Sequence, residues 1–204
     1  SGPKSARSVL LHPDVDAAVL ETARGGVLRE GLAFDRCDVA VVTNVGSGDH
    51  LGLNYITTVN ELAVLKRVIV QNVADDGYAV LNAADPIVAG MAVNCPSEII
   101  FFAVDGHHPV LAAHKAKGKR VVYVEAGHLI AAEGKFKESI PLSDIPITRN
   151  GLIGFQVENV MASVAAAWAV NASFEAIRRG LKSFANENDN APGRFNMFSY
   201  RGAT

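Results

Sequence analysis

Short apolar runs alternate with stretches of helical periodicity along the first half of the chain. Apolar runs of this kind, bounded by turn residues, are typical of buried β-strands. They predict strands at residues 16–22, 38–44, 78–85 and 97–105. Because strands that alternate with helices are typical of a parallel sheet covered by helices, the pattern predicts an α/β fold. We expect a three-layer sandwich with a mostly parallel sheet flanked by helices.

Helices are predicted where apolar residues recur every three or four positions. The stretch 58–73 begins with Thr-Val-Asn-Glu, a capping box in which Thr58 and Glu61 satisfy each other's backbone N–H groups. A shorter helix is predicted after Pro86. Residues 154–172 and 174–184 predict two further helices.

One stretch of the second half has the period of strands instead. Residues 120–134 predict a hairpin that turns near Gly127, followed by an irregular strand that reaches residues 145–148. Polar and turn residues then break the helical pattern at 185–194, which predicts a linker. We therefore expect one domain over residues 1–190, and the linker with the first strand of a further domain over residues 191–204.

Composition narrows the class of protein. With 204 residues, of which 49% are hydrophobic and 20% charged, the chain can bury a sizeable core. The formal net charge of −2 and the lack of long basic runs argue against a nucleic-acid or polybasic membrane surface. The basic stretch 115–120 is predicted to be a solvated turn.

The compartment is predicted from cysteine usage and from missing signals. Cys37 and Cys95 lie far apart without metal-ligand spacing, so each is predicted to be a small core residue in a reducing compartment. The sequence contains no apolar run long enough to span a bilayer, and its start lacks the apolar region of a signal peptide. We therefore expect a cytoplasmic protein that has no membrane partner. The sequence is compatible with a homo-oligomer but does not give the oligomeric state.

Candidate chemistry lies where predicted strands end, because ligands of open parallel sheets bind beyond the carboxyl ends of the strands. Glu21 ends one predicted strand, and Thr43 and Asn44 end the next. Glycine-bearing turns follow both, and the second leads to His50. A carboxylate and an imidazole from adjacent loops could share a divalent cation. Taken singly, each of these residues could equally be structural or merely exposed.

Lys66 is the strongest single signal. On a helical projection it falls inside the apolar arc of residues 59–73, whereas Arg67 takes the opposite, solvent face. A lysine in an apolar stripe snorkels to solvent, pairs with a carboxylate, or loses its proton through desolvation. The neutral amine of the last case is a nucleophile, also toward carbon dioxide.

Two further positions are candidates for nucleotide contacts. Asn82 and Asp85 end another strand, where an amide could read a purine edge; a plain strand-to-helix turn is the alternative. Arg194 lies in the linker, where a guanidinium could bind a phosphate, or could be an ordinary exposed arginine. The chain has neither G-x-x-x-x-G-K-[ST] nor G-x-G-x-x-G after a strand, so it carries no self-sufficient phosphate loop.

Several motif strings resemble one known family. They are "VLETARGGVLREGLAFDRCDVAVVTNVGSGDHLGL", "ELAVLKRVIV", "AVLNAADP", "FQVENVMASVAAAWA" and "PGRFN", and they run nearly from end to end. They closely resemble the Mur-ligase-like half of cyanophycin synthetases, and more distantly Mur peptide ligases and folylpolyglutamate synthetases.

The resemblance implies an ATP- and Mg²⁺-dependent amide ligase. Such enzymes activate a carboxylate as an acyl phosphate, which an amine attacks to form an amide with release of ADP and phosphate. In cyanophycin synthetases the amine is arginine, and the carboxylate belongs to an aspartate side chain of the growing polymer. The resemblance also implies a truncated central domain, because the family's phosphate loop lies upstream of the match and its last domain downstream. The chain alone is therefore expected to be inactive.

Site roles are likewise implied by the resemblance. Glu21 and His50 resemble the magnesium-binding residues, and Lys66 stands where Mur relatives have a lysine that can be carbamylated. Thr43 and Asn44 resemble the strand end that shapes the metal site. Contacts to the nucleotide are implied for Asn82, Asp85, Asn159 and Arg194.

Two alternatives stay open. The chain could belong to a ligase of the same superfamily with another acceptor, such as a peptidoglycan precursor or a folate. It could also be a non-catalytic module that binds a nucleotide or a polymer. Ala84 favours the second alternative, because relatives usually carry a second acid at that position.

Overall fold

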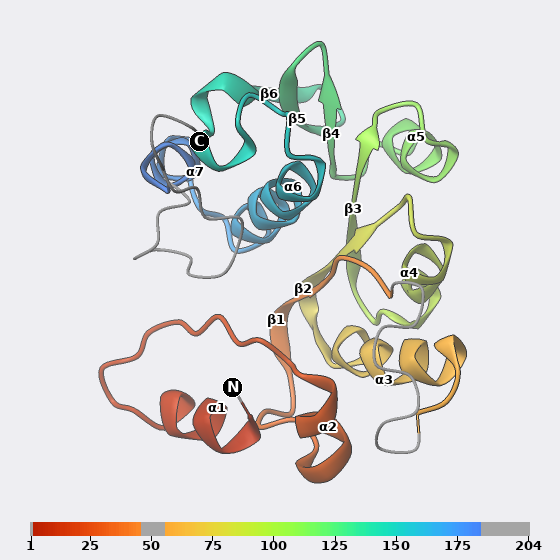
Figure 1. The fold of residues 1–204 in the computed structure, drawn as a ribbon, viewed down its shortest axis with the longest axis vertical. Helices are drawn as coiled ribbons and strands as arrows, with labels where there is room; N and C mark the ends of the chain where they lie inside the picture. Colours follow the sequence, from red (N-terminus) through yellow and green to blue (C-terminus); the bar gives the residue numbers. More distant parts are fainter. Residues whose placement is uncertain (1, 46–55, 185–204) are drawn as a thin grey trace, which may run out of the picture. The chain divides into compact units, whose positions relative to one another are not determined.

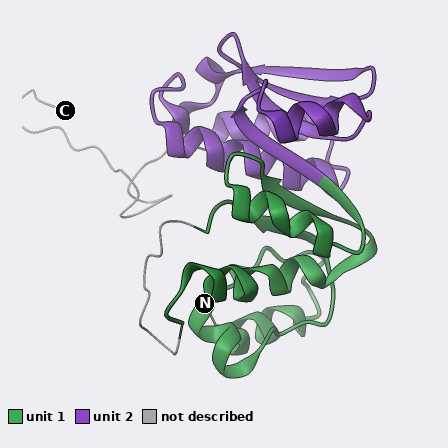
Figure 2. Ribbon diagram, turned by 90° about the vertical axis from the view of Figure 1, so that its right-hand side faces the viewer, with its two compact units in different colours: residues 1–99 green, residues 100–204 purple. Residues whose placement is uncertain are grey.

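A computed structural model describes residues 2–45 and 56–184. The chain divides into two compact units, Ser1–Ile99 and Ile100–Thr204 (Figure 2). No helix in the described ranges is long and apolar enough to cross a bilayer.

The first unit is built around a parallel strand pair, shown in Figure 1 with its helices. Strand β1 (Cys37–Val42) pairs with β2 (Val73–Asn82), with Val39 opposite Tyr78 and Val42 opposite Leu81. Helix α3 (Val59–Gln71) makes the crossover that a parallel pair requires, and it packs against both strands. The remaining elements of the first unit are α1 (Pro3–Leu10), α2 (Arg24–Glu30), α4 (Pro86–Gly90) and the 3-10 turn η1 (Met91–Asn94).

Helix α3 begins where the sequence predicts it. The side chain of Thr58 accepts a hydrogen bond from the backbone N–H of Glu61 at 3.2 Å, and Glu61 Oε2 accepts one from the backbone N–H of Thr58 at 3.0 Å. The predicted capping box is therefore confirmed. Leu62 and Val70 bury the inner face of the helix.

The second unit combines a parallel pair with antiparallel hairpins. Strand β3 (Glu98–Asp105), whose first two residues precede the unit boundary, runs parallel to β4 (Val121–Glu125). Helix α5 (Pro109–Ala116) connects them. Strands β5 (His128–Glu133) and β6 (Phe136–Pro141) continue antiparallel, so the predicted hairpin with its turn at Ala126 and Gly127 is confirmed. The 3-10 turns η2 (Leu142–Asp144) and η3 (Pro146–Thr148) follow.

Two helices complete this unit. Helix α6 (Gly154–Ala169) packs against β4, and α7 (Phe174–Ser183) packs against α6. Phe136, Trp168 and Phe174 form an aromatic cluster with ring centroids 5.6–5.8 Å apart. The guanidinium carbon of Arg120 lies 4.6 Å from the centroid of the Trp168 ring. The predicted α/β class, with parallel strands flanked by helices, is confirmed.

Three predictions of local structure are wrong. Residues 16–22 form neither strand nor helix, and Val19 is fully exposed at 104%. An apolar run becomes a strand only when a neighbouring strand accepts its backbone hydrogen bonds, and no described strand lies beside this one. Residues 145–148 form a 3-10 turn rather than a strand, since Pro146 has no N–H to give to a ladder. The basic stretch 115–120 is not one solvated turn, because Lys115 belongs to α5 and Arg120 packs on an indole ring.

Candidate functional site

The carboxyl ends of β1 and β2 lie at the same edge of the first unit. Because the strands are parallel and Val42 lies opposite Leu81, residues 43–45 and residues 82–85 leave the sheet side by side. Five of the residues that the sequence singles out lie here: Thr43, Asn44, Lys66, Asn82 and Asp85. We call this group the strand-end cluster.

Asn82 joins the two strand ends. It is only 5% exposed, its Nδ2 donates to the carbonyl of Thr43 at 3.0 Å, and its Oδ1 accepts from the N–H of Ala84 at 2.9 Å. Both ends of the amide are thus engaged with backbone groups. A buried amide that is satisfied in this way holds the edge in shape.

Asp85 is the N-cap of α4 and also fastens β1. Its Oδ1 accepts from the N–H groups of Ile87 and Val88 at 2.9 and 3.2 Å. Its Oδ2 accepts from the N–H of Val45 at 2.9 Å. One carboxylate therefore orders the first turn of a helix and the chain that leaves the neighbouring strand.

Lys66 reaches the same edge from α3. Its Nζ donates to the backbone carbonyl of Asn44 at 2.7 Å. The predicted inward position of this lysine is confirmed, because the side chain is half-buried and its amine meets the end of β1. Lys66, Asn82 and Asp85 thus hold three consecutive residues, 43 to 45, by backbone atoms.

The side chains of Thr43 and Asn44 extend from this fixed backbone and contact each other. Asn44 is exposed, and its Nδ2 donates to Thr43 Oγ1 at 3.3 Å. An amide and a hydroxyl on a backbone fixed at three points are pre-organised, so little freedom is lost when a ligand binds.

Glu21 lies in the first unit, on the segment that precedes α2. Its carboxylate is exposed, and the residue lines a small hollow together with Pro3 of α1 and Gly26 of α2. The second proposed metal ligand, His50, lies outside the described residues, and so does Arg194. Over residues 2–45 and 56–184, no group of three His, Cys, Asp or Glu side chains could hold a metal ion by itself.

Asn159 belongs to the second unit, on α6. It is exposed, and its Nδ2 donates to Oε1 of the buried Gln156 at 3.3 Å. Gln156 therefore orients the amide of Asn159 from one helical turn before it.

Comparison with known proteins places the chain in a family. The family model described as "Mur ligase middle domain" matches residues 4–167. The chain is 41% identical over 200 residues to a cyanophycin synthetase of Synechocystis sp., and 42% identical over 202 residues to one of Geminocystis herdmanii. Each match covers 98% of this chain and 23% of the relative, so the chain spans less than a quarter of those proteins.

More distant relatives are Mur ligases. The UDP-N-acetylmuramoylalanine–D-glutamate ligase of Geobacillus kaustophilus is 31% identical over 155 residues, which is 76% of this chain and 30% of the relative. Among solved structures, MurF from Acinetobacter baumannii has a TM-score of 0.52 at 19% identity, over 80% of this chain and 32% of that chain. At this identity the likeness shows a shared fold. The chain belongs to the Mur ligase middle domain family.

Proposed function

We propose that the chain is the central part of an ATP-dependent ligase that joins arginine to aspartate side chains of cyanophycin. The carboxylate would be activated as an acyl phosphate, and the amine would displace the phosphate to form the amide. The observation that supports this most is the 41–42% identity to cyanophycin synthetases along 98% of the chain. The match to a muramoyl ligase is lower, at 31% over 76% of the chain, so another acceptor is the second candidate.

Our proposal for the metal rests on the kind of donor atoms that the first unit offers. Mg²⁺ prefers oxygen ligands and is usually held by one or two side chains together with phosphate oxygens, rather than by a full protein cage. The exposed carboxylate of Glu21 is such a ligand, and Asn44 offers an exposed amide oxygen. We propose that Glu21 and His50 hold the metal. When bound, magnesium ATP would supply the phosphoryl group and neutralise the charge that develops as two anions combine.

The chain's own residues then divide into two roles. We propose that Lys66, Asn82 and Asp85 act as positioning residues, because their polar atoms already bind the backbone of residues 43–45. Asn44 and Thr43 face the ligand from that fixed backbone. Asn159 and Arg194 are proposed to contact the nucleotide. Carbamylation of Lys66 is compatible with the geometry, since a carbamate nitrogen keeps one N–H for the carbonyl of Asn44.

We propose that residues 1–190 form the central domain of the ligase without its phosphate loop, and that residues 191–204 lead into the next domain. Since the chain spans 23% of the cyanophycin synthetases, we expect it to fold alone but to release no ADP.

The test is ADP release by the intact enzyme that contains this chain. With ATP, Mg²⁺ and an aspartate polymer, we expect release only when arginine is the added amine. Release with D-glutamate or with another amine in place of arginine would favour the second ligase candidate. Nucleotide binding without release for any amine would support a non-catalytic module instead.

His50→Ala tests the proposed metal ligand in the same assay. We expect lower turnover that excess Mg²⁺ restores only in part, because one protein ligand is lost. Turnover equal to the wild type would remove His50 from the metal site.

A further inference from the structure

The turn that leads into α6 contains the single Asn-Gly pair of the sequence, Asn150 and Gly151. The N–H of Leu152 donates to the carbonyl of Arg149 at 3.2 Å, which closes a four-residue turn. Inside this turn Asn150 has a φ of 58° and Gly151 a φ of 84°. Positive φ at both central residues is the geometry of a type I′ turn, for which Asn-Gly is a preferred pair. The side chain of Asn150 is exposed to water.

An Asn-Gly pair can lose ammonia without an enzyme. A base takes the proton of the glycine N–H, and the glycine nitrogen attacks Cγ of the asparagine. The new N–Cγ bond closes a succinimide ring, while the Cγ–Nδ2 bond breaks and the side-chain nitrogen leaves with a proton as ammonia. Water then opens the ring at Cγ to give aspartate, or at the backbone carbonyl to give isoaspartate. Glycine favours the attack because no Cβ shields its nitrogen.

The fold holds the nitrogen that would make this attack. The N–H of Gly151 donates to Thr148 Oγ1 at 3.2 Å. Thr148 is completely buried, and its hydroxyl lies 3.1 and 2.9 Å from the carbonyl oxygens of Leu142 and Ile145, so it has an acceptor for its own proton. Leu142 also packs on the turn, since a Cβ on Gly151 would meet its Cδ1 at 2.9 Å. The hydrogen bond keeps the proton on the Gly151 nitrogen, and the packing opposes the rotation that the attack requires.

We propose that Asn150 is a site of spontaneous deamidation and that Thr148 is a positioning residue that slows the reaction in the folded chain. When isoaspartate forms, the main chain runs through Cβ and Cγ and becomes one atom longer. The turn then cannot keep its closing bond from Leu152 together with the bond from the N–H of Ile153 to the carbonyl of Thr148 at 3.1 Å. Both bonds immediately precede α6, so the start of that helix should loosen. The proposal does not rest on the proposed ligase function.

Asn171 is a comparison within the same unit. It is exposed and has a φ of 59°, close to the value of Asn150. The next residue is Ala172, whose Cβ shields the nitrogen and whose N–H donates to the carbonyl of Ala167 at 3.0 Å. We therefore expect Asn171 to stay unchanged under conditions that convert Asn150. The difference between the two asparagines isolates the effect of the following glycine.

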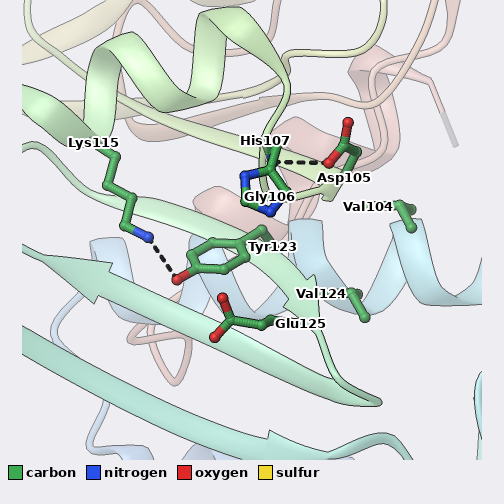
Figure 3. Close-up of a pocket in the computed structure, with 8 residues that line it drawn as sticks. All are labelled: Val104, Asp105, Gly106, His107, Lys115, Tyr123, Val124 and Glu125. Carbon is green, nitrogen blue, oxygen red and sulfur yellow. Dashed lines mark hydrogen bonds between the residues drawn. The ribbon is translucent and has the colours of Figure 1, made fainter.

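An Asp-Gly pair of the second unit lines a hollow of about 310 Å³ (Figure 3). The lining residues are Val104, Asp105, Gly106, His107, Lys115, Tyr123, Val124 and Glu125. Lys115 Nζ donates to the hydroxyl of Tyr123 at 2.8 Å, and a Cβ on Gly106 would meet Cδ2 of this ring at 2.5 Å. Asp105 Oδ1 accepts from the N–H of His107 at 2.8 Å. A carboxylate is a poorer electrophile than an amide, and the ring restrains Gly106, so we expect this pair to stay unchanged.

The test is incubation of the 204-residue chain in mildly alkaline buffer, folded and in guanidinium, followed by mass spectrometry of peptides cut after glutamate. One peptide, residues 139–158, contains Asn150 as its single asparagine, and the next, residues 159–175, contains Asn159 and Asn171. We expect the first peptide to gain the mass difference between an amide and an acid, faster from the unfolded than from the folded chain. The second peptide should keep its mass over the same time.

Variants of Thr148 test its role. Thr148→Val removes the acceptor and should raise the rate in the folded chain about two- to tenfold, the factor that one hydrogen bond gives. Thr148→Ser keeps a hydroxyl and should react at the wild-type rate, and in guanidinium all three chains should react equally fast. If Thr148→Val does not fold, hydrogen exchange of the Gly151 amide in the wild type decides, because the proposal requires this amide to be protected.

Asn150→Asp is the reference for the added charge. Asp-Gly also suits a type I′ turn, so this variant should keep the turn and unfold at the wild-type urea concentration. The isoaspartate form that accumulates in the aged wild type should unfold at a lower urea concentration than Asn150→Asp.

Three results would overturn the proposal. The first is that residues 139–158 keep their mass in the folded and in the unfolded chain. The second is that the two states react equally fast, or that Asn171 reacts as fast as Asn150. The third is that a folded Thr148→Val reacts no faster than Thr148→Ser, or that the Gly151 amide exchanges without protection.

Discussion

Replacing Asp85 by asparagine separates the two tasks of its carboxylate. Asparagine caps helices as well as aspartate does, so its side-chain oxygen can still accept from the N–H groups of Ile87 and Val88. The other side-chain atom becomes an NH₂ group, which faces the N–H of Val45 and cannot accept from it. Val45 is 2% exposed, so its N–H loses a partner without gaining water.

The cost follows from the structure. A buried donor left without its acceptor costs about 1–3 kcal/mol. We therefore expect Asp85→Asn to lower the free energy of unfolding by roughly that amount. Asp85→Ala removes the cap as well, which adds about 1 kcal/mol. The difference between the two variants thus isolates the cap, and the asparagine variant isolates the tether to β1.

Urea unfolding followed by far-UV circular dichroism gives the free energies, and amide hydrogen exchange gives the location. In Asp85→Asn the exchange of the Val45 amide should become faster, while the amides of Val88 and Ala89 keep their protection. Ser97→Ala is a control in the same unit, because its hydroxyl contacts the carbonyls of Asp75 and Gly77, away from the strand-end cluster. An unchanged Val45 exchange rate together with wild-type stability in Asp85→Asn would refute the reasoning.

Four further substitutions test other features. Lys66→Met should leave the fold intact and lower the free energy of unfolding in urea by about 1 kcal/mol, because one hydrogen bond to the carbonyl of Asn44 is lost. The same variant should slow ADP release by the intact enzyme. If the variant unfolds instead, the lysine is structural. Backbone N–H groups hold the pKa of the Glu61 carboxyl below its usual 4.5. The carboxylate therefore contributes stability above pH 4.5, and this contribution disappears as the pH falls through the lower pKa of the folded state. In the wild type the urea midpoint should decrease over this pH range, and in Glu61→Gln this decrease should be absent. Gly77→Ala should lower the melting temperature, since a Cβ would meet the carbonyl oxygen of Asp38 at 2.4 Å, at a cost of about 1–3 kcal/mol. Gly180→Ala in α7 has open space around the new Cβ. This variant should raise the melting temperature through a gain of about 0.5–1 kcal/mol in stability.

Local signals in the sequence predicted the features that depend on neighbours along the chain. The capping box at Thr58 and the inward position of Lys66 follow from spacing within one helix, and both are confirmed. The turn at Gly127 follows from its two flanking runs and is confirmed as well. Each of these three predictions depends only on the spacing of apolar residues within one element and on the residues at its ends.

Features that depend on distant segments were missed. The run 16–22 has the composition of a strand, yet strand formation requires a partner that composition does not reveal. Arg67 was expected in solvent, whereas its Nε is buried. Both α2 and η1 pack against α3, and a helical projection does not include such neighbouring elements. The roles of Asn82 and Asp85 as backbone ties were also hidden, since their partners lie about forty residues earlier in the chain.

The hollow of the second unit was missed for a related reason. The sequence pattern assigns Lys115 to a solvated turn, and nothing in its neighbours along the chain links it to Tyr123 or Glu125. One signal in the sequence was overlooked. Pro109 is at the first position of α5, and proline at such a position predicts a helix, which includes Lys115.

The two cysteines bear on how the protein can be labelled. Burial raises the pKa of the Cys37 thiol and of the Cys95 thiol, so at neutral pH both are almost entirely protonated. Maleimides and spin labels react with thiolates, and half-buried neutral thiols react slowly. A cysteine introduced on an exposed surface, for example by Lys117→Cys at the end of α5, should therefore take a fluorophore selectively in the otherwise native sequence. A probe at that position requires the removal of neither natural cysteine.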